Sequence, residues 1–115
     1  MTITRKSPKL FHFSLISRMQ GYCLDVVEDL YYANDIYVRP DSKAGWAQRI
    51  AYQRKALSTL KLLSYVSQLA MEQSAIQPKQ YEQISALTLD TQNLLGAWAL
   101  SDRKRFEAAG RKQKT

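Results

Sequence analysis

Few residues of this chain could carry out chemistry, and the acidic ones are the first candidates. Asp25, Glu28 and Asp29 fall within one helical turn and could hold a divalent cation, since hard cations prefer carboxylate oxygens. No histidine or fourth carboxylate accompanies them at ligand spacing. We therefore expect no metal site, and we interpret these acids as a surface that docks onto a basic partner or a neighbouring subunit.

Catalytic groups are equally sparse. His12, the single histidine, lies between Phe11 and Phe13, which favours a packing role over general-base chemistry. Cys23 is the single cysteine and belongs to a periodic apolar stripe, so we expect it to be buried, and it cannot form an internal disulfide. No Ser/His/Asp set, glycine-rich phosphate loop or paired-carboxylate site can be assembled. The sequence predicts a protein without enzymatic activity or cofactor.

Basic residues are the abundant class. Lys and Arg number 17 against 10 Asp and Glu, a formal net charge of +7 over 115 residues, which favours a polyanionic partner. The charge is segregated: residues 1–18, 39–61 and 103–115 are rich in Lys and Arg, whereas residues 25–35 carry acids and no base. On a helical wheel Lys43, Arg54 and Lys61 lie within about 20° of one another.

This pattern has two readings. The first is a track that binds nucleic-acid phosphates largely without regard to base sequence. The second is a solvated helix face that keeps the protein soluble. The predicted nucleic-acid-binding residues are Lys43, Arg49, Arg54, Lys55, Lys61, Arg103, Lys104 and Arg105. The seven tyrosines could stack on bases, although packing is their more common role.

Apolar residues recur at steps of three and four, which predicts three helices that position these groups. We expect helices at about 9–38, 43–73 and 78–101, with breaks at Pro40 and Pro78. Short loops between long amphipathic helices favour an all-α, antiparallel helical bundle over residues 1–102. Residues 103–115 are predicted to form a basic, flexible tail.

Two further expectations come from the apolar segments. The longest uncharged runs are about half of the ~20 residues that a membrane helix needs, and residues 1–18 lack a signal-peptide cleavage pattern, so we expect a cytoplasmic protein with no membrane partner. The apolar faces are also broader than a three-helix core requires. A homo-oligomer is therefore expected.

Two segments resemble a known family. Residues 7–18, with the sequence SPKLFHFSLISR, and residues 78–98, which begin with PKQYE and end with LLGAW, are similar to parts of the accessory variability determinant (Avd) family. These are four-helix-bundle proteins of diversity-generating retroelements, related to bundle proteins encoded in ribosomal RNA intervening sequences. The similarity covers most of residues 7–100.

The resemblance implies a basic ring, a pentamer, that contacts a reverse transcriptase and its template RNA or cDNA during mutagenic copying. It also implies structural or interface roles for Leu94, Leu95, Gly96 and Trp98, with Gly96 allowing helices to approach closely. The family's first helix normally precedes the segment at residue 7, and here only six residues do. Either another subunit or partner supplies a fourth helix, or this is a shortened relative. The alternative function is a helical interaction or scaffold module that does not bind nucleic acid.

Overall fold

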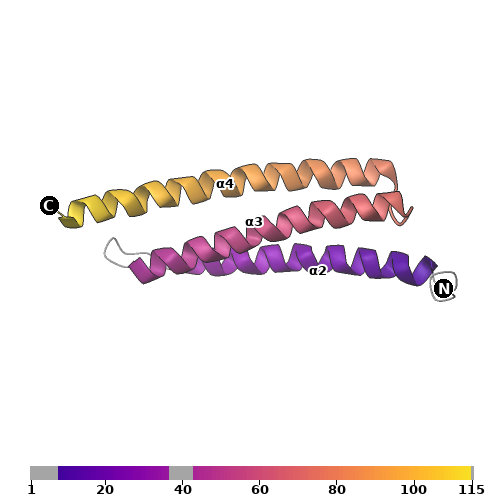
Figure 1. Cartoon of the computed structure of the whole chain (residues 1–115), viewed down its shortest axis with the longest axis horizontal. Helices are drawn as coiled ribbons and strands as arrows, with labels where there is room; N and C mark the ends of the chain where they lie inside the picture. Colours follow the sequence, from indigo (N-terminus) through magenta and orange to yellow (C-terminus); the bar gives the residue numbers. More distant parts are fainter. Residues whose placement is uncertain (1–7, 37–42, 115) are drawn as a thin grey trace.

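Three long α-helices make up nearly all of the chain that the structure describes. The computed structural model describes the backbone of residues 8–36 and 43–114 and the side chains of residues 9–36 and 43–108. Helix α2 spans Pro8–Asp35, α3 spans Lys43–Glu72 and α4 spans Pro78–Lys114. They run antiparallel in a rod 68 Å long and 24 by 21 Å across (Figure 1). The predicted all-α antiparallel arrangement is confirmed.

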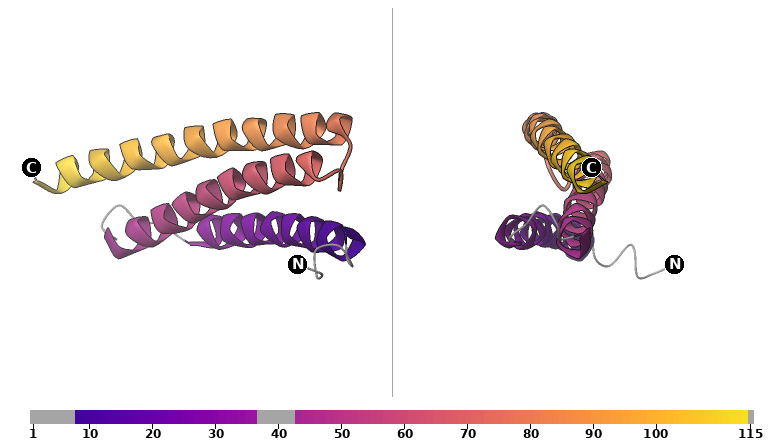
Figure 2. Two further views of the ribbon diagram at one scale, coloured as in Figure 1. Left: turned by 45° about the vertical axis from the view of Figure 1, so that its right-hand side comes forward. Right: turned by 90° about the vertical axis from the view of Figure 1, so that its left-hand side faces the viewer.

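Helix α3 is the central element. It packs against both α2 and α4, whereas the backbones of α2 and α4 do not approach each other. Seen end-on, α3 lies at the corner of an angle whose arms end at α2 and α4 (Figure 2). The three helices therefore occupy three corners of a four-helix arrangement, with the corner between α2 and α4 left open.

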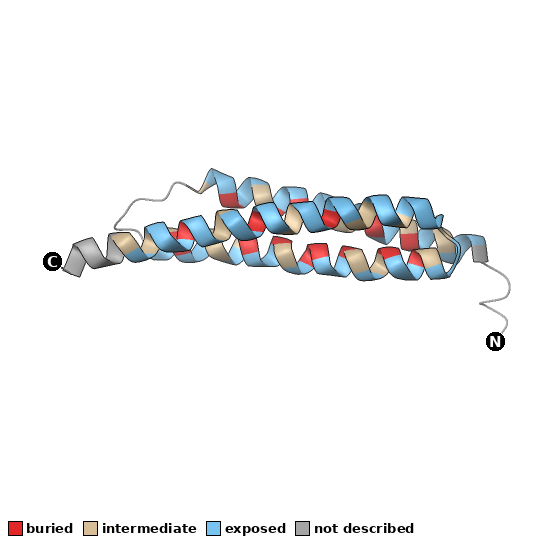
Figure 3. Ribbon diagram, turned by 90° about the horizontal axis from the view of Figure 1, so that it is seen from above, coloured by how far each residue is buried: buried red, intermediate tan, exposed pale blue. Residues whose placement is uncertain are grey.

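Two apolar clusters hold the helices together. Leu15 and Met19 of α2 pack with Leu63 and Ala70 of α3 near one end of the rod. The second cluster joins Val26, Ala56, Leu60 and Leu95, so it touches all three helices. Small buried residues such as Ala56 and Ala70 let the neighbouring helices come close to α3. Buried positions form a narrow inner stripe on each helix, and most of the other described residues are exposed (Figure 3).

The turn between α3 and α4 shows why α3 stops. Ser74 adopts a left-handed conformation, with φ of 61°, and its N–H donates to the carbonyl of Met71 at 3.0 Å. The Ala75 N–H donates to the carbonyl of Ala70 at 2.7 Å, which completes a Schellman C-cap. Helix α4 then begins with one half of a capping box, because the side-chain oxygen of Gln80 accepts the Gln77 N–H at 2.8 Å.

The predicted end of the third helix, near residue 101, is wrong. Helix α4 continues to Lys114, so residues 103–114 extend the helix and do not form a separate tail. These residues contain no proline, and ten of the twelve are Arg, Lys, Ala, Glu or Gln, which favour helix. Phe106 also anchors them, since its ring packs on Trp46 with centroids 5.8 Å apart. The first helix ends at Asp35, and the predicted residues 37 and 38 lie outside the described residues.

Two further predictions about packing are corrected. Cys23 is exposed, and Tyr22 packs against the first cluster instead. At 100° per residue Cys23 lies about 80° around the helix from Leu15, too far to reach α3. Gly96 brings no other helix close among the described residues, because a Cβ there would meet nothing within 4 Å.

Candidate nucleic-acid interface

Four of the predicted basic residues gather on one side of the molecule. Lys43, Arg54 and Lys61 are exposed on the side of α3 that faces away from its buried residues, along about 27 Å of helix. Gln92 of α4 lines a shallow hollow with Lys61 and Tyr65, so this side of α4 borders the same surface. Arg103 is exposed and lies about 20° from Gln92 around α4. We call Lys43, Arg54, Lys61 and Arg103 the outer basic face.

The cations of the outer basic face are available to a ligand. None of the four forms an ion pair with an acid in the part of the chain that the structure describes. Tyr65, one turn beyond Lys61, is 74% exposed and could offer its ring to a base. The surface can therefore bind phosphates electrostatically and accept a stacked ring.

The structure does not bring the other four predicted residues to this surface. Lys104 is exposed but lies about 100° around α4 from Arg103. The Nζ of Lys55 is 3.6 Å from a carboxylate oxygen of Asp29. Arg49 and Arg105 both bind Asp102. Three of the eight predicted cations are thus already paired within the chain.

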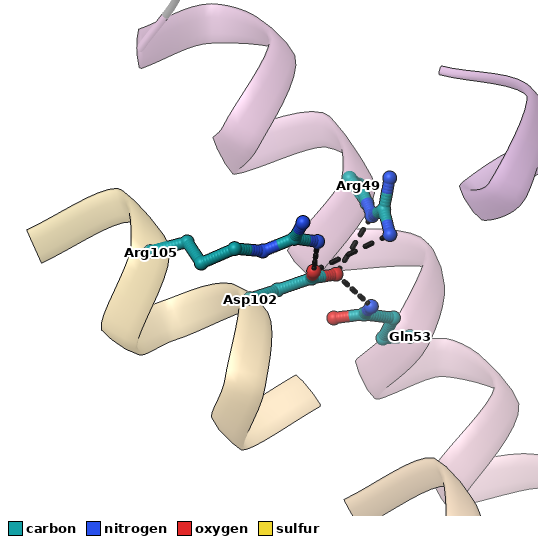
Figure 4. Close-up of polar contacts among 4 residues, drawn as sticks. All are labelled: Arg49, Gln53, Asp102 and Arg105. Carbon is teal, nitrogen blue, oxygen red and sulfur yellow. Dashed lines mark hydrogen bonds and ion pairs between the residues drawn. The ribbon is translucent and has the colours of Figure 1, made fainter. Parts of the chain in front are cut away.

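Asp102 is the residue that the sequence reasoning missed. Its side chain is fully buried between α3 and α4 and accepts hydrogen bonds from three residues (Figure 4). Arg49 donates from Nε at 2.7 Å and from Nη2 at 3.3 Å, Gln53 donates from Nε2 at 2.7 Å, and Arg105 donates from Nη2 at 2.7 Å. The Arg49 guanidinium also lies 4.9 Å from the centre of the Trp98 ring. This network joins α3 to α4 at a defined register.

The environment of Asp102 makes the stability of the fold depend on pH. Burial alone raises the pKa of this carboxyl, but the hydrogen bonds from Arg105, Gln53 and Arg49, with the charge of Arg49, lower the pKa below its ordinary value. A pKa that is lower in the folded state contributes stability above the unfolded pKa of about 3.9, and this contribution is lost as the pH falls through the folded pKa.

We therefore expect the stability difference between the wild type and Asp102→Asn to shrink with acid. Urea denaturation followed by far-UV circular dichroism, at several pH values from about 6 down to about 2, measures this difference. A difference that stays constant across that range would show that the Asp102 charge does not contribute.

The predicted acidic surface is divided by the fold. Asp25 and Glu28 are exposed, whereas Asp29 is buried against α3, where Lys55 is its ion-pair partner. The second carboxylate oxygen of Asp29 has no hydrogen-bond partner among the described residues. Within residues 8–36 and 43–114, no group of three His, Cys, Asp or Glu side chains could hold a metal ion.

An apolar groove opens between α2 and α4. Leu30, Asn34, Thr91, Leu94, Leu95 and Trp98 line it, and its volume is about 420 Å³. Three of the four residues that the resemblance marks as structural thus form its wall, but they differ in burial. Leu95 belongs to the core, whereas Leu94 is 74% exposed.

Comparisons with protein-family models, with curated proteins and with solved structures gave no match. In the described part of the chain, none of the helices combines the length and the apolar character needed to cross a membrane.

Proposed function

We propose that this chain is a non-catalytic accessory protein that binds nucleic acid through the outer basic face. Following the resemblance of residues 7–18 and 78–98, we further propose that it serves a diversity-generating retroelement, where it binds the reverse transcriptase together with template RNA or cDNA. The observation that supports the proposal is a surface with exposed cations that have no acidic partner among the described side chains.

The arrangement favours phosphates over a specific base sequence. Lys43, Arg54, Lys61 and Arg103 lie on helices and present flexible cationic ends, which suit contacts to phosphates. Each cation that neutralises a phosphate releases condensed counterions, so affinity depends steeply on salt. Tyr65 can add base stacking, which is tolerant of sequence and selects single strands.

Titration of the wild-type protein into fluorescently labelled single-stranded RNA tests the proposal. Four phosphate contacts imply a slope of about −3 in log affinity against log salt, hence a loss of about fiftyfold between 50 and 200 mM salt. Parallel titrations with single-stranded and duplex DNA identify the preferred nucleic acid. Absent binding, or binding that does not change with salt, would contradict the proposal.

The groove between α2 and α4 favours a second candidate, a helical protein-interaction module. Its walls are mostly apolar, with Leu30, Leu94 and Trp98 available to a helix of a protein partner. Under this function, a pull-down with a retroelement reverse transcriptase survives both nuclease and high salt. Under the nucleic-acid function alone, either treatment releases the enzyme.

A further inference from the structure

The side of α2 that faces away from α3 is apolar and uncovered. Leu24 lies nine residues after the buried Leu15, which places it about 180° around the helix. The large apolar residues on this outward side are between 63% and 69% exposed: Leu10, Phe13, Leu24, Val27 and Tyr31. The opposite side of α2 packs on α3, so α2 is apolar around most of its circumference. Helices of that kind are normally buried on all sides.

The outward residues follow a coiled-coil repeat. They fall at positions 10, 13, 17, 20, 24, 27, 31 and 34, which alternate steps of three and four without a break. Ser17, Gln20 and Asn34 are the polar members, and all eight positions are exposed. A heptad repeat of this kind forms a seam against one other helix.

We propose that this seam binds the same seam of a second copy, with the two α2 helices antiparallel about a two-fold axis near Tyr22. In an antiparallel coiled coil each a position faces a d position, so residue n of one copy faces residue 44 − n of the other. Phe13 then meets the partner's Tyr31, Gln20 meets the partner's Leu24, and Ser17 meets the partner's Val27. One two-fold axis pairs all eight positions of the repeat, as a self-complementary interface requires. Phe13 with Tyr31 is the layer of two aromatic rings, and each other layer places one polar side chain opposite an apolar one.

The charges of α2 select the antiparallel orientation. Residues 9–24 contain Lys9 and Arg18 and no acid, whereas residues 25–35 contain four acids and no base. An antiparallel pair places the basic half of each helix beside the acidic half of the other, and it also opposes the helix dipoles. A parallel pair would place the acidic halves together.

This interface leaves the proposed nucleic-acid surface uncovered. The seam faces away from α3, so α2 itself separates the second copy from Lys43, Arg54 and Lys61. Each dimer presents two outer basic faces. The interface does not depend on nucleic-acid binding, and either can fail without the other.

Native mass measurement tests the proposal. The wild type is expected to be a dimer or a larger assembly with an even number of copies. The variant Leu24→Glu/Val27→Glu is expected to be a monomer or to have half the wild-type mass. Leu89→Glu/Leu100→Glu, which alters two exposed leucines of α4, is the matched control and is expected to keep the wild-type mass. Far-UV circular dichroism shows whether each variant is helical. A wild-type monomer or a pentamer would overturn the proposal, as would a helical seam variant with unchanged mass.

Cross-linking tests the orientation independently of variant stability. Cys23 lies beside the seam and close to the proposed axis, and it is exposed. A short bis-maleimide is therefore expected to join two wild-type copies through Cys23. In a Cys23→Ser background, a mixture of Phe13→Cys and Tyr31→Cys proteins is expected to oxidise mainly to the mixed disulfide. Predominant cross-links between two Phe13→Cys copies would show a parallel pair and overturn the proposal.

Discussion

Replacing Asp102 by alanine is expected to lower the free energy of unfolding by about 3 kcal/mol, as removal of one partner from a buried ion pair does. The Asp102 carboxylate is completely buried, and the side chain of Arg49 is only 12% exposed. The substitution leaves Arg49 and the Gln53 amide without their acceptor between α3 and α4. The side chain of Arg105 is 62% exposed and can turn to water, so the loss of its ion pair with Asp102 adds little to the destabilisation.

Chemical denaturation followed by far-UV circular dichroism measures this effect. Asp90→Ala, at an exposed position of the same helix, is expected to change the free energy of unfolding by less than about 0.5 kcal/mol. Asp29→Ala is a buried control, and we expect it to cost less than Asp102→Ala because Asp29 has a single ion pair at 3.6 Å and one oxygen without a partner. Equal losses at Asp29 and Asp102 would show that the Asp102 network adds no stability beyond an ordinary buried carboxylate.

Removing the charge of the outer basic face is expected to have the largest effect on binding. The variant carries glutamine at positions 43, 54, 61 and 103. The electrostatic contribution of four phosphate contacts falls with a slope of about −3 in log affinity against log salt and vanishes near 1 M salt. At about 100 mM salt, removing these contacts is therefore expected to lower the RNA affinity by two to three orders of magnitude. Titration into the labelled single-stranded RNA measures the loss.

A matched variant separates position from net charge. Lys9, Arg18, Lys79 and Lys104 are exposed and lie off the outer basic face, and glutamine at these four positions removes the same charge. We expect this control to lose less than about tenfold in affinity, because long-range attraction is screened over about 8 Å at physiological salt. Equal losses in the two variants would mean that net charge, and not the outer basic face, determines binding.

The helical stripes predicted the fold because each helix buries residues at three- and four-residue steps against its neighbours. The helix types, their order and the antiparallel arrangement follow from that periodicity. The burial of Asp102 could not be predicted in the same way, because a charged residue normally indicates that a buried apolar stripe has ended. Yet Asp102 lies seven residues after the buried Leu95, two helical turns along the same face. A carboxylate at such a position, with Arg49 and Gln53 on a facing helix, is the signal that was available.

The basic residues show a second limit of sequence reasoning. A helical wheel placed Lys43, Arg54 and Lys61 together, and all three are exposed on one side of α3. The wheel could not show that Arg49 turns toward Asp102 or that Lys55 lies beside Asp29, because both contacts join residues on different helices. Which cations remain available to a phosphate is set by the tertiary packing.

The apolar residues of α2 show a third limit of sequence reasoning. Leu15, Met19 and Val26 are buried, whereas Val27 is 64% exposed, because the apolar residues of α2 occupy two faces that a single periodic stripe does not distinguish. The structure resolves it into an inner face on α3 and an outward heptad repeat. One sequence pattern thus contained two contact surfaces, of which the chain itself covers one.

The most direct test of the central claim is the change in salt dependence between the wild type and the outer-face variant with four glutamines. RNA affinity is measured for both proteins at several salt concentrations, and log affinity is plotted against log salt. If Lys43, Arg54, Lys61 and Arg103 contact phosphates, the slope of the variant is shallower by about 3. Two parallel lines with the same slope would contradict a nucleic-acid interface on this face of α3 and α4.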